Sequence, residues 1–141
     1  MLGFETAKPD EEQPSPPPEF SMAAGDFVSI YGCAKEKSRW HGIASCFFLD
    51  TAPCVVEYLK VMFDMLENGG VLINFGPLLF HWSGPPLRPD ETSFEDYKSK
   101  HSHMDGRYLR SVDMPYDGVR EVLLQIGFEI VEEYADLPAL Y

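Results

Sequence analysis

The sequence predicts an α/β fold, in which parallel strands alternate with helices. An apolar run over residues 40–50 ends abruptly at an acid, and a second, nearly all-apolar run covers residues 71–75. Between them, over residues 53–67, apolar side chains recur at spacings of three and four, as on one face of a helix. Strand, helix and strand joined by short turns form a βαβ unit, whose crossover we expect to be right-handed.

The composition is that of a globular domain and excludes several partner classes. The 141 residues are 45% hydrophobic and 13% aromatic, enough for one domain with a core. A formal net charge of -12 would repel nucleic acid and anionic membrane surfaces. The three cysteines show no CxxC spacing, which favours a reducing setting, cytoplasmic or nuclear. Neither a secretory signal nor an apolar run of about 18 residues occurs, so no membrane partner is expected.

The chain before the first apolar run is predicted to hold a linker and two short elements. Residues 1–18 combine five prolines with acidic side chains, a composition typical of an extended linker or the tail of an insertion. Residues 20–24 are predicted to form a short strand. Gly25 and Asp26 then form a turn that leads into a brief helix toward Tyr31.

The chain after the predicted helix holds a second strand–helix–strand pattern. Asn-Gly-Gly at residues 68–70 is predicted to stop the helix. Residues 82–114 are rich in Pro, Gly and charge and are predicted to be a lid or insertion, with a helical turn around residues 94–98. A helix is predicted over residues 115–127, stopped by a glycine, and an edge strand over residues 128–134.

Three segments carry a resemblance to a known family, and a fourth gives weaker support. They are FSMAAGDF at 20–27, SCFFLDTA at 45–52 and ENGGVLINFGPLLFH at 67–81, with PYDGVREVLLQIGFEI at 115–130. Together they resemble the carnosine N-methyltransferase, or N2227-like, family of S-adenosylmethionine-dependent methyltransferases. The resemblance implies a Rossmann-like methyltransferase sheet with flanking helices. Residues 19–141 would form its C-terminal portion, incomplete at both ends.

The resemblance also implies a methyl donor, an acceptor and a set of donor-binding residues. The donor is S-adenosylmethionine, and the acceptor is carnosine or a related histidine-containing peptide. Asp26 would accept a hydrogen bond from the adenine amine, Phe27 would cover the base, and Cys46 would line the donor pocket. From the residues alone, Gly25-Asp26 is ordinary turn chemistry and Cys46 a small buried hydrophobe.

Asp50 and His81 are the predicted catalytic residues. Each follows a predicted parallel strand, and the carboxyl ends of such strands border the crevice where α/β sheets bind ligands. A carboxylate that accepts from one imidazole nitrogen fixes the tautomer and stabilises the imidazolium that methylation forms. From the residues alone, Asp50 or Thr51 could equally cap the next helix, and His81 could be a packed or surface residue. The resemblance implies that Asp50 and His81 bind and orient the substrate imidazole.

The predicted lid holds residues that suggest other kinds of site. His101 and His103 form an HxH pair, but no Cys or carboxylate lies at a zinc-ligand spacing around them, so no metal site is predicted. Tyr97, Tyr108 and Tyr116 are candidates for the wall of the substrate pocket, with packing as the alternative.

The glycine pattern limits what these residues alone are expected to do. The sequence contains no GxGxG loop, and Gly69-Gly70 follows a predicted helix rather than a strand. We therefore expect the isolated chain to bind the donor poorly and to turn over little. Two functions stay open at this point. One is an N-methyltransferase fragment that acts on a histidine imidazole, and the other is a non-catalytic α/β binding or interaction module derived from such an enzyme.

Overall fold

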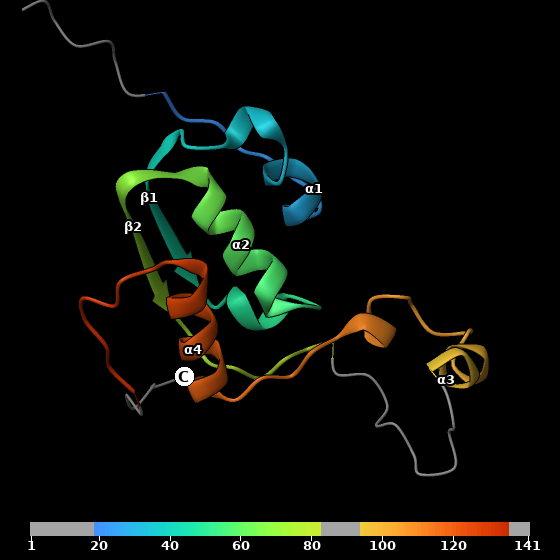
Figure 1. Cartoon of the computed structure of the whole chain (residues 1–141). Helices are drawn as coiled ribbons and strands as arrows, with labels where there is room; N and C mark the ends of the chain where they lie inside the picture. Colours follow the sequence, from blue (N-terminus) through green and yellow to red (C-terminus); the bar gives the residue numbers. More distant parts are fainter. Residues whose placement is uncertain (1–18, 83–93, 136–141) are drawn as a thin grey trace, which may run out of the picture.

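The structure, a computed structural model, describes residues 19–82 and 94–135 and has the predicted α/β class. The predicted linker at 1–18 and parts of the predicted lid and C-terminal end lie outside the described residues. Figure 1 shows two strands with helices packed beside them and a separate arm, which carries α3 and the 3-10 turn Tyr108–Arg110. The elements are α1 (Phe27–Tyr31), β1 (Trp40–Cys46), α2 (Val55–Met65), β2 (Leu66–Phe75), α3 (Phe94–Lys100) and α4 (Tyr116–Ile126). A Rossmann-like sheet has more strands than these two, so that arrangement stays a prediction.

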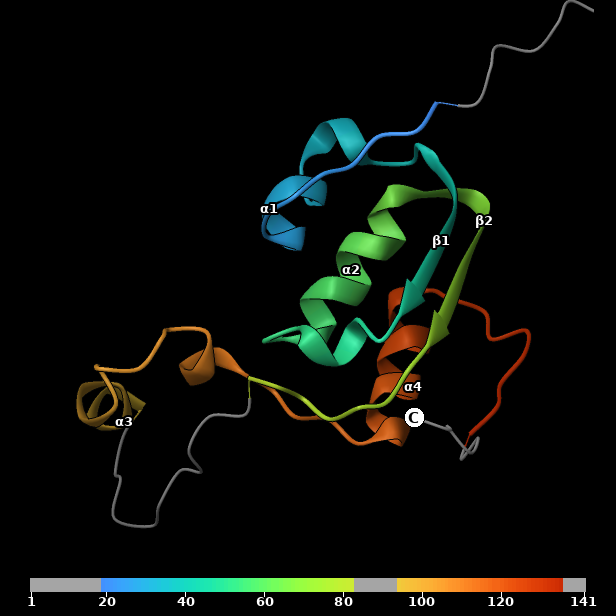
Figure 2. The same ribbon diagram turned by 180° about the vertical axis from the view of Figure 1, so that it is seen from behind.

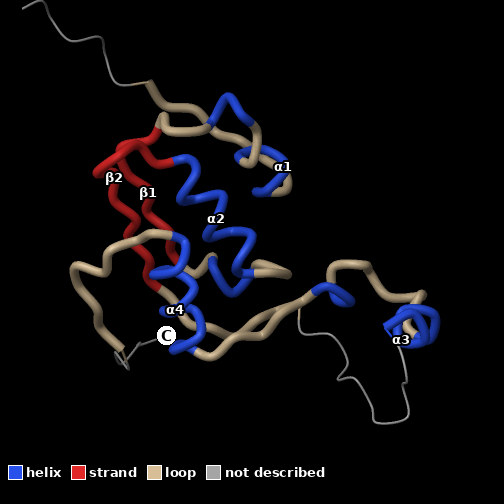
Figure 3. Tube along the Cα trace, in the orientation of Figure 1, coloured by secondary structure: helices blue, strands red, loops and turns tan. Residues whose placement is uncertain are grey.

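The predicted βαβ unit forms the centre of the molecule. β1 and β2 pair in parallel, with Gly42 opposite Val71 and Cys46 opposite Phe75. The helix α2 connects the two strands and packs with α4 over the same face of the sheet, as Figures 1 and 2 show from opposite sides. Figure 3 shows the same arrangement as a tube, with the helices in blue and the two strands in red. The buried core is Leu49, Ala52, Val55, Tyr58, Leu59, Met62, Phe80 and Val119.

Both strands differ in extent from the prediction. The strand predicted over residues 40–50 ends at Cys46, because Phe47 adopts a φ of 50° and turns the chain into the 3-10 turn Leu49–Thr51. α2 ends at Met65, and residues 68–70 belong to β2 rather than to a helix stop. They fit into the strand because the register slips between Trp40 and Gly42, which lets Gly69 take a φ of 83°.

Two predicted short strands are wrong, whereas the predicted helices are confirmed. Residues 20–24 and 128–134 form neither helix nor strand, and neither segment pairs with a strand in the described part of the chain. Alternating side chains alone do not make a strand, because a ladder needs a neighbour that offers free backbone groups. α1, α3 and α4 lie where the sequence places them, and Gly127, with a φ of 121°, ends α4 as predicted.

Candidate functional site

Two strained turns meet at the carboxyl end of the sheet. Phe47 and Phe80 have φ values of 50° and 47°, a conformation that is unusual for bulky side chains. Gly76 lies so close to the first turn that a Cβ there would be 2.9 Å from the backbone of Phe47. Phe47 precedes Asp50 by three residues, and Phe80 directly precedes His81. Strained backbone of this kind concentrates where a structure fixes functional side chains.

The structure brings Asp50 and His81 together, as their places after the two strands predict. The backbone N–H of His81 donates to the carbonyl oxygen of Asp50 at 3.1 Å. The Asp50 carboxylate accepts from the backbone N–H of Leu79 at 3.3 Å, and its Oδ2 lies 3.6 Å from Nε2 of His81. The acid is therefore held by the segment that carries the histidine.

The capping alternative for Asp50 and Thr51 is wrong. α2 begins after Cys54, and no side chain caps its first turn. The hydroxyl of Thr51 donates to the carbonyl of Phe48 at 2.6 Å, within its own 3-10 turn. Asp50 lies within the 3-10 turn, four residues before the N-cap of α2, and its carboxylate accepts from the segment after β2 instead.

Asp50 and His81 differ sharply in their access to solvent. The side chain of Asp50 is 3% exposed and that of His81 is 61% exposed. The imidazole is therefore open to solvent, whereas the carboxylate is not. A carboxylate beside Nε2 favours the tautomer with the proton on that nitrogen, which leaves Nδ1 as an acceptor.

Asp26 caps α1, so the turn chemistry considered for it is present. Its Oδ1 accepts from the backbone N–H of Ser29 at 2.9 Å and from the Ser29 hydroxyl at 2.8 Å. These hydrogen bonds hold the pKa of Asp26 below its usual value, with a smaller contribution from the positive charge of Arg107. Both bonds use the same carboxylate oxygen, Oδ1.

Phe27 connects the predicted donor side with the turn that holds Asp50. Its ring centroid lies 5.3 Å from that of Phe48 and 4.9 Å from that of Tyr58, and the latter two rings are 5.2 Å apart. Burial, together with the negative charge of Asp26, raises the pKa of Tyr58. Tyr58 was not predicted as a site residue. Its position on the apolar face of the predicted helix was the only signal for it.

Cys46 lies apart from the other predicted donor residues. It ends β1 opposite Phe75, and its side chain is exposed, so the alternative of a small buried hydrophobe is wrong. In the described part of the chain no hydrogen bond or ring contact joins it to Asp26 or Phe27. A role in lining a donor pocket stays a prediction. The donor-binding roles of Asp26 and Phe27 stay predictions as well.

Of the three predicted tyrosines, Tyr108 makes an edge-to-face contact with the residue that follows His81. Its ring centroid lies 4.9 Å from that of Trp82, the residue that follows His81. By contrast, Tyr97 stacks on a histidine one turn later in the chain, and Tyr116 donates its hydroxyl to a glutamate of the C-terminal segment.

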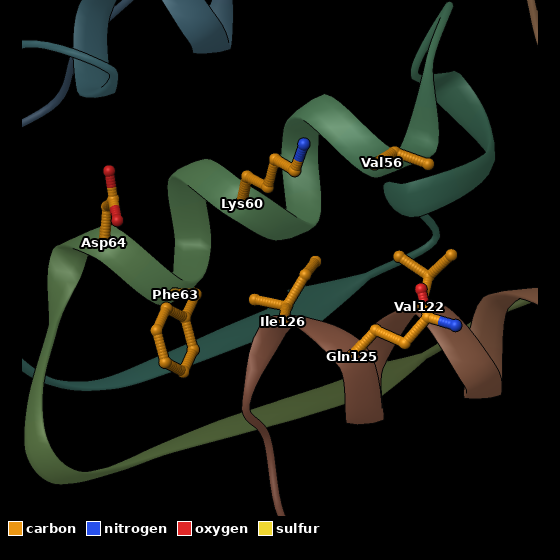
Figure 4. A pocket seen from close by; sticks show the side chains of 7 residues that line it. All are labelled: Val56, Lys60, Phe63, Asp64, Val122, Gln125 and Ile126. Atoms are coloured by element: carbon orange, nitrogen blue, oxygen red, sulfur yellow. The ribbon is translucent and has the colours of Figure 1, made fainter.

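A groove of about 500 Å³ lies between α2 and α4 and is separate from this site. Figure 4 shows its lining, which consists of Val56, Lys60, Phe63, Asp64, Val122, Gln125 and Ile126. None of the predicted site residues lines it. In residues 19–82 and 94–135, no three His, Cys, Asp or Glu side chains are grouped as metal ligands. Within the same ranges, no helix has the length and apolar character needed to cross a bilayer.

Comparison with known proteins places these features in a family. The profile of the family described as Carnosine N-methyltransferase matches residues 4–141. The chain belongs to the carnosine N-methyltransferase family. The Carnosine N-methyltransferase of Rattus norvegicus is 35% identical over 135 residues, which are 94% of this chain and 28% of that relative. The Schizosaccharomyces pombe relative is 33% identical over 113 residues, 80% of this chain and 27% of its own length.

The match to the Rattus norvegicus relative covers most of this chain but only a small share of the relative's length. A Dictyostelium discoideum member is 46% identical over 67 residues, 48% of this chain and 14% of that protein. The chain thus spans little more than a quarter of the length of the Rattus norvegicus relative. The residues that form the Asp50–His81 pair come from the two segments, 45–52 and 67–81, that carried the resemblance in the sequence.

Proposed function

We propose that this chain is part of an S-adenosylmethionine-dependent N-methyltransferase that methylates an imidazole nitrogen of carnosine or a related histidine-containing peptide. The observation that carries the proposal is the buried Asp50 carboxylate 3.6 Å from the exposed His81, at the ends of two parallel strands. Membership of the carnosine N-methyltransferase family supports the reaction class. Asp26 and Phe27 are the residues that we assign to the adenine end of the donor.

The proposed reaction needs little covalent catalysis by the protein. An imidazole nitrogen attacks the methyl carbon with its lone pair, and the carbon–sulfur bond breaks with its electron pair going to sulfur. Near neutral pH an imidazole with a pKa of about 6.5 already has a free lone pair, so no base must first remove a proton. Rate then depends on orientation and on stabilising the imidazolium, which are the roles that we assign to His81 and Asp50.

Calorimetry with carnosine tests the acceptor half of the proposal. We expect Asp50→Asn to weaken carnosine binding at least about tenfold, because a charged hydrogen-bond acceptor is lost. Asp64→Asn is the matched control, since Asp64 is an exposed acid that pairs with Lys37. Equal carnosine affinity in wild type and Asp50→Asn, with both folded by circular dichroism, contradicts the role of Asp50. Transfer of a radiolabelled methyl group from S-adenosylmethionine to carnosine, measured on a product of the same gene that includes a glycine-rich donor loop, tests the donor half.

The exposed face of the sheet favours the second candidate function, a non-catalytic interaction module. Val71, Ile73 and Phe75 are 56%, 64% and 50% exposed on neighbouring positions of β2. Apolar patches of this kind often mark contact surfaces. Peptide binding without methyl transfer, also in a longer product of the same gene, favours the module. Transfer that Asp50→Asn abolishes favours the enzyme.

A further inference from the structure

One cation, Arg107, packs against Trp82, the residue that follows His81 in the chain. The guanidinium carbon of Arg107 lies 4.1 Å from the ring centroid of Trp82. Trp82 follows His81 in the chain, and consecutive Cα atoms are about 3.8 Å apart. Figures 1 and 2 both show the segment after β2 and the segment before α4 running side by side toward the 3-10 turn Tyr108–Arg110. The tertiary fold, not the sequence spacing, brings this cation to Trp82.

Trp82 and Tyr108 form an aromatic pair beneath the Arg107 side chain. Trp82 packs against Tyr108 at 4.9 Å between ring centroids, so the indole that carries the guanidinium is itself supported. Stacking on the face of an indole favours a cation electrostatically. The positive charge of Arg107 helps to lower the pKa of Asp26 and offsets part of the rise in the pKa of Tyr58, so Arg107 also lies near these two residues.

Arg107 already holds a carboxylate in this structure. Its Nη2 lies 2.8 Å from Oδ2 of Asp105, its Nε lies 3.1 Å from Oδ1, and its backbone N–H donates to the same Oδ1 at 2.9 Å. These bonds lower the pKa of Asp105 to about 2. The pair is exposed, with 47% of the Arg107 side chain and 42% of the Asp105 side chain accessible. Exposed ion pairs contribute little stability, so another carboxylate can replace Asp105 at small cost.

We propose that Arg107 binds the C-terminal carboxylate of the acceptor peptide and makes this site specific for histidine at a free C-terminus. The inference rests on the proposed function. In a C-terminal histidine, the carboxylate and the imidazole belong to one residue, so their binding groups must be neighbours. His81 and Trp82 are consecutive residues, and Trp82 carries the Arg107 guanidinium on its ring. A guanidinium fork matches a carboxylate. A histidine inside a protein chain lacks that carboxylate and gains nothing from Arg107.

Calorimetry with carnosine and with its C-terminal amide separates this inference from the proposed function. Wild type should bind carnosine about tenfold more tightly than the amide, since the loss of one charge-assisted contact costs that much. In Arg107→Gln the two ligands should bind equally, at the affinity of the amide for wild type. Arg110→Gln, three residues further along the same turn, is the matched control and should retain the preference for carnosine.

Asp105→Asn should raise the affinity for carnosine. This result is not expected if Arg107 has only a structural role. Without the competing carboxylate, carnosine should bind about two- to fivefold more tightly, while the amide stays unchanged. Equal affinity of wild type for carnosine and its amide overturns the inference but leaves the imidazole site in place. If neither ligand binds, the proposed acceptor site fails and the inference fails with it. Circular dichroism of each variant excludes unfolding as the cause.

Discussion

The two faces of the sheet differ in what covers them, although both are apolar. One face packs against α2 and α4, where Ile43 and Leu72 contact the buried core. The other face presents Val71, Ile73 and Phe75 to solvent in the described part of the chain. Their partners on β1 are small, namely Gly42, Ala44 and Cys46. Parallel sheets are normally covered on both faces, so apolar sequence shows that a face is made for burial but not what buries it.

Truncation in the covered core should have the largest effect on stability. Leu59 is 0% exposed in the middle of α2, and Leu59→Ala should lower the free energy of unfolding by about 3 kcal/mol through lost contacts and a cavity. Leu124→Ala on α4, where the leucine is 41% exposed, is the matched control and should cost under about 1 kcal/mol. Urea denaturation followed by circular dichroism measures both. Similar losses would show that the face under α2 is not the core.

The turn where the two strands end should be next in sensitivity. Gly76 has a φ of 149°, and a Cβ there would meet the backbone of Phe47 at 2.9 Å. Gly76→Ala should therefore cost about 2 kcal/mol, from backbone strain and displacement of the Phe47 turn. Gly106→Ala is the control, because a Cβ at that position has no atom within 4 Å. Since Phe47 leads to Asp50, Gly76→Ala should also weaken carnosine binding, and an unchanged affinity would contradict the coupling.

Neighbouring residues of β2 allow the sharpest comparison of the two faces. Leu72 packs against the core, whereas Ile73 is 64% exposed on the other side. We expect Leu72→Ala to cost about 1–2 kcal/mol and Ile73→Ala under about 0.5 kcal/mol in the same urea experiment. If Ile73→Ala costs as much as Leu72→Ala, the open face is covered in solution. Sedimentation velocity then shows whether a second copy covers it.

The smallest expected effect concerns the segment that follows α4. Glu133 accepts from the hydroxyl of Tyr116 and from Nε of Arg120 at 3.1 Å, and these bonds hold its pKa below the usual 4.5. These bonds attach the segment after α4 to that helix. Because the pKa of Glu133 is depressed in the folded state, the attachment is complete above pH 4.5 and is lost as pH falls through the lower, folded-state value.

Amide exchange of residues 128–135 measures this attachment. Exchange should rise on acidification in wild type and be fast at neutral pH in Glu133→Gln, with Glu129→Gln as the control. The Asp105–Arg107 pair, with a pKa of about 2 for Asp105, should persist to lower pH than the Glu133 attachment. Exchange of residues 128–135 that does not depend on pH would contradict the attachment.

The local pattern of the sequence predicted those parts of the fold that depend on neighbours along the chain. α2 and α4 follow from apolar spacings of three and four, and Gly127 ends α4 because it tolerates a positive φ. The strand ends were less predictable. The apolar run continues through Phe47, and only the packing of Gly76 against that turn shows where β1 stops. The strands predicted at 20–24 and 128–134 failed because pairing depends on a distant partner.

The candidate site also has features that follow from the sequence and features that depend on the tertiary structure. By itself, the sequence determined that Asp50 and His81 follow two parallel strands, which places both at one edge of the sheet because parallel strands share their carboxyl ends. Tertiary structure alone decided that Asp50 is buried while His81 is exposed, and that Arg107 lies over Trp82. Burial and stacking depend on segments far apart in the sequence, whose contacts no local period encodes.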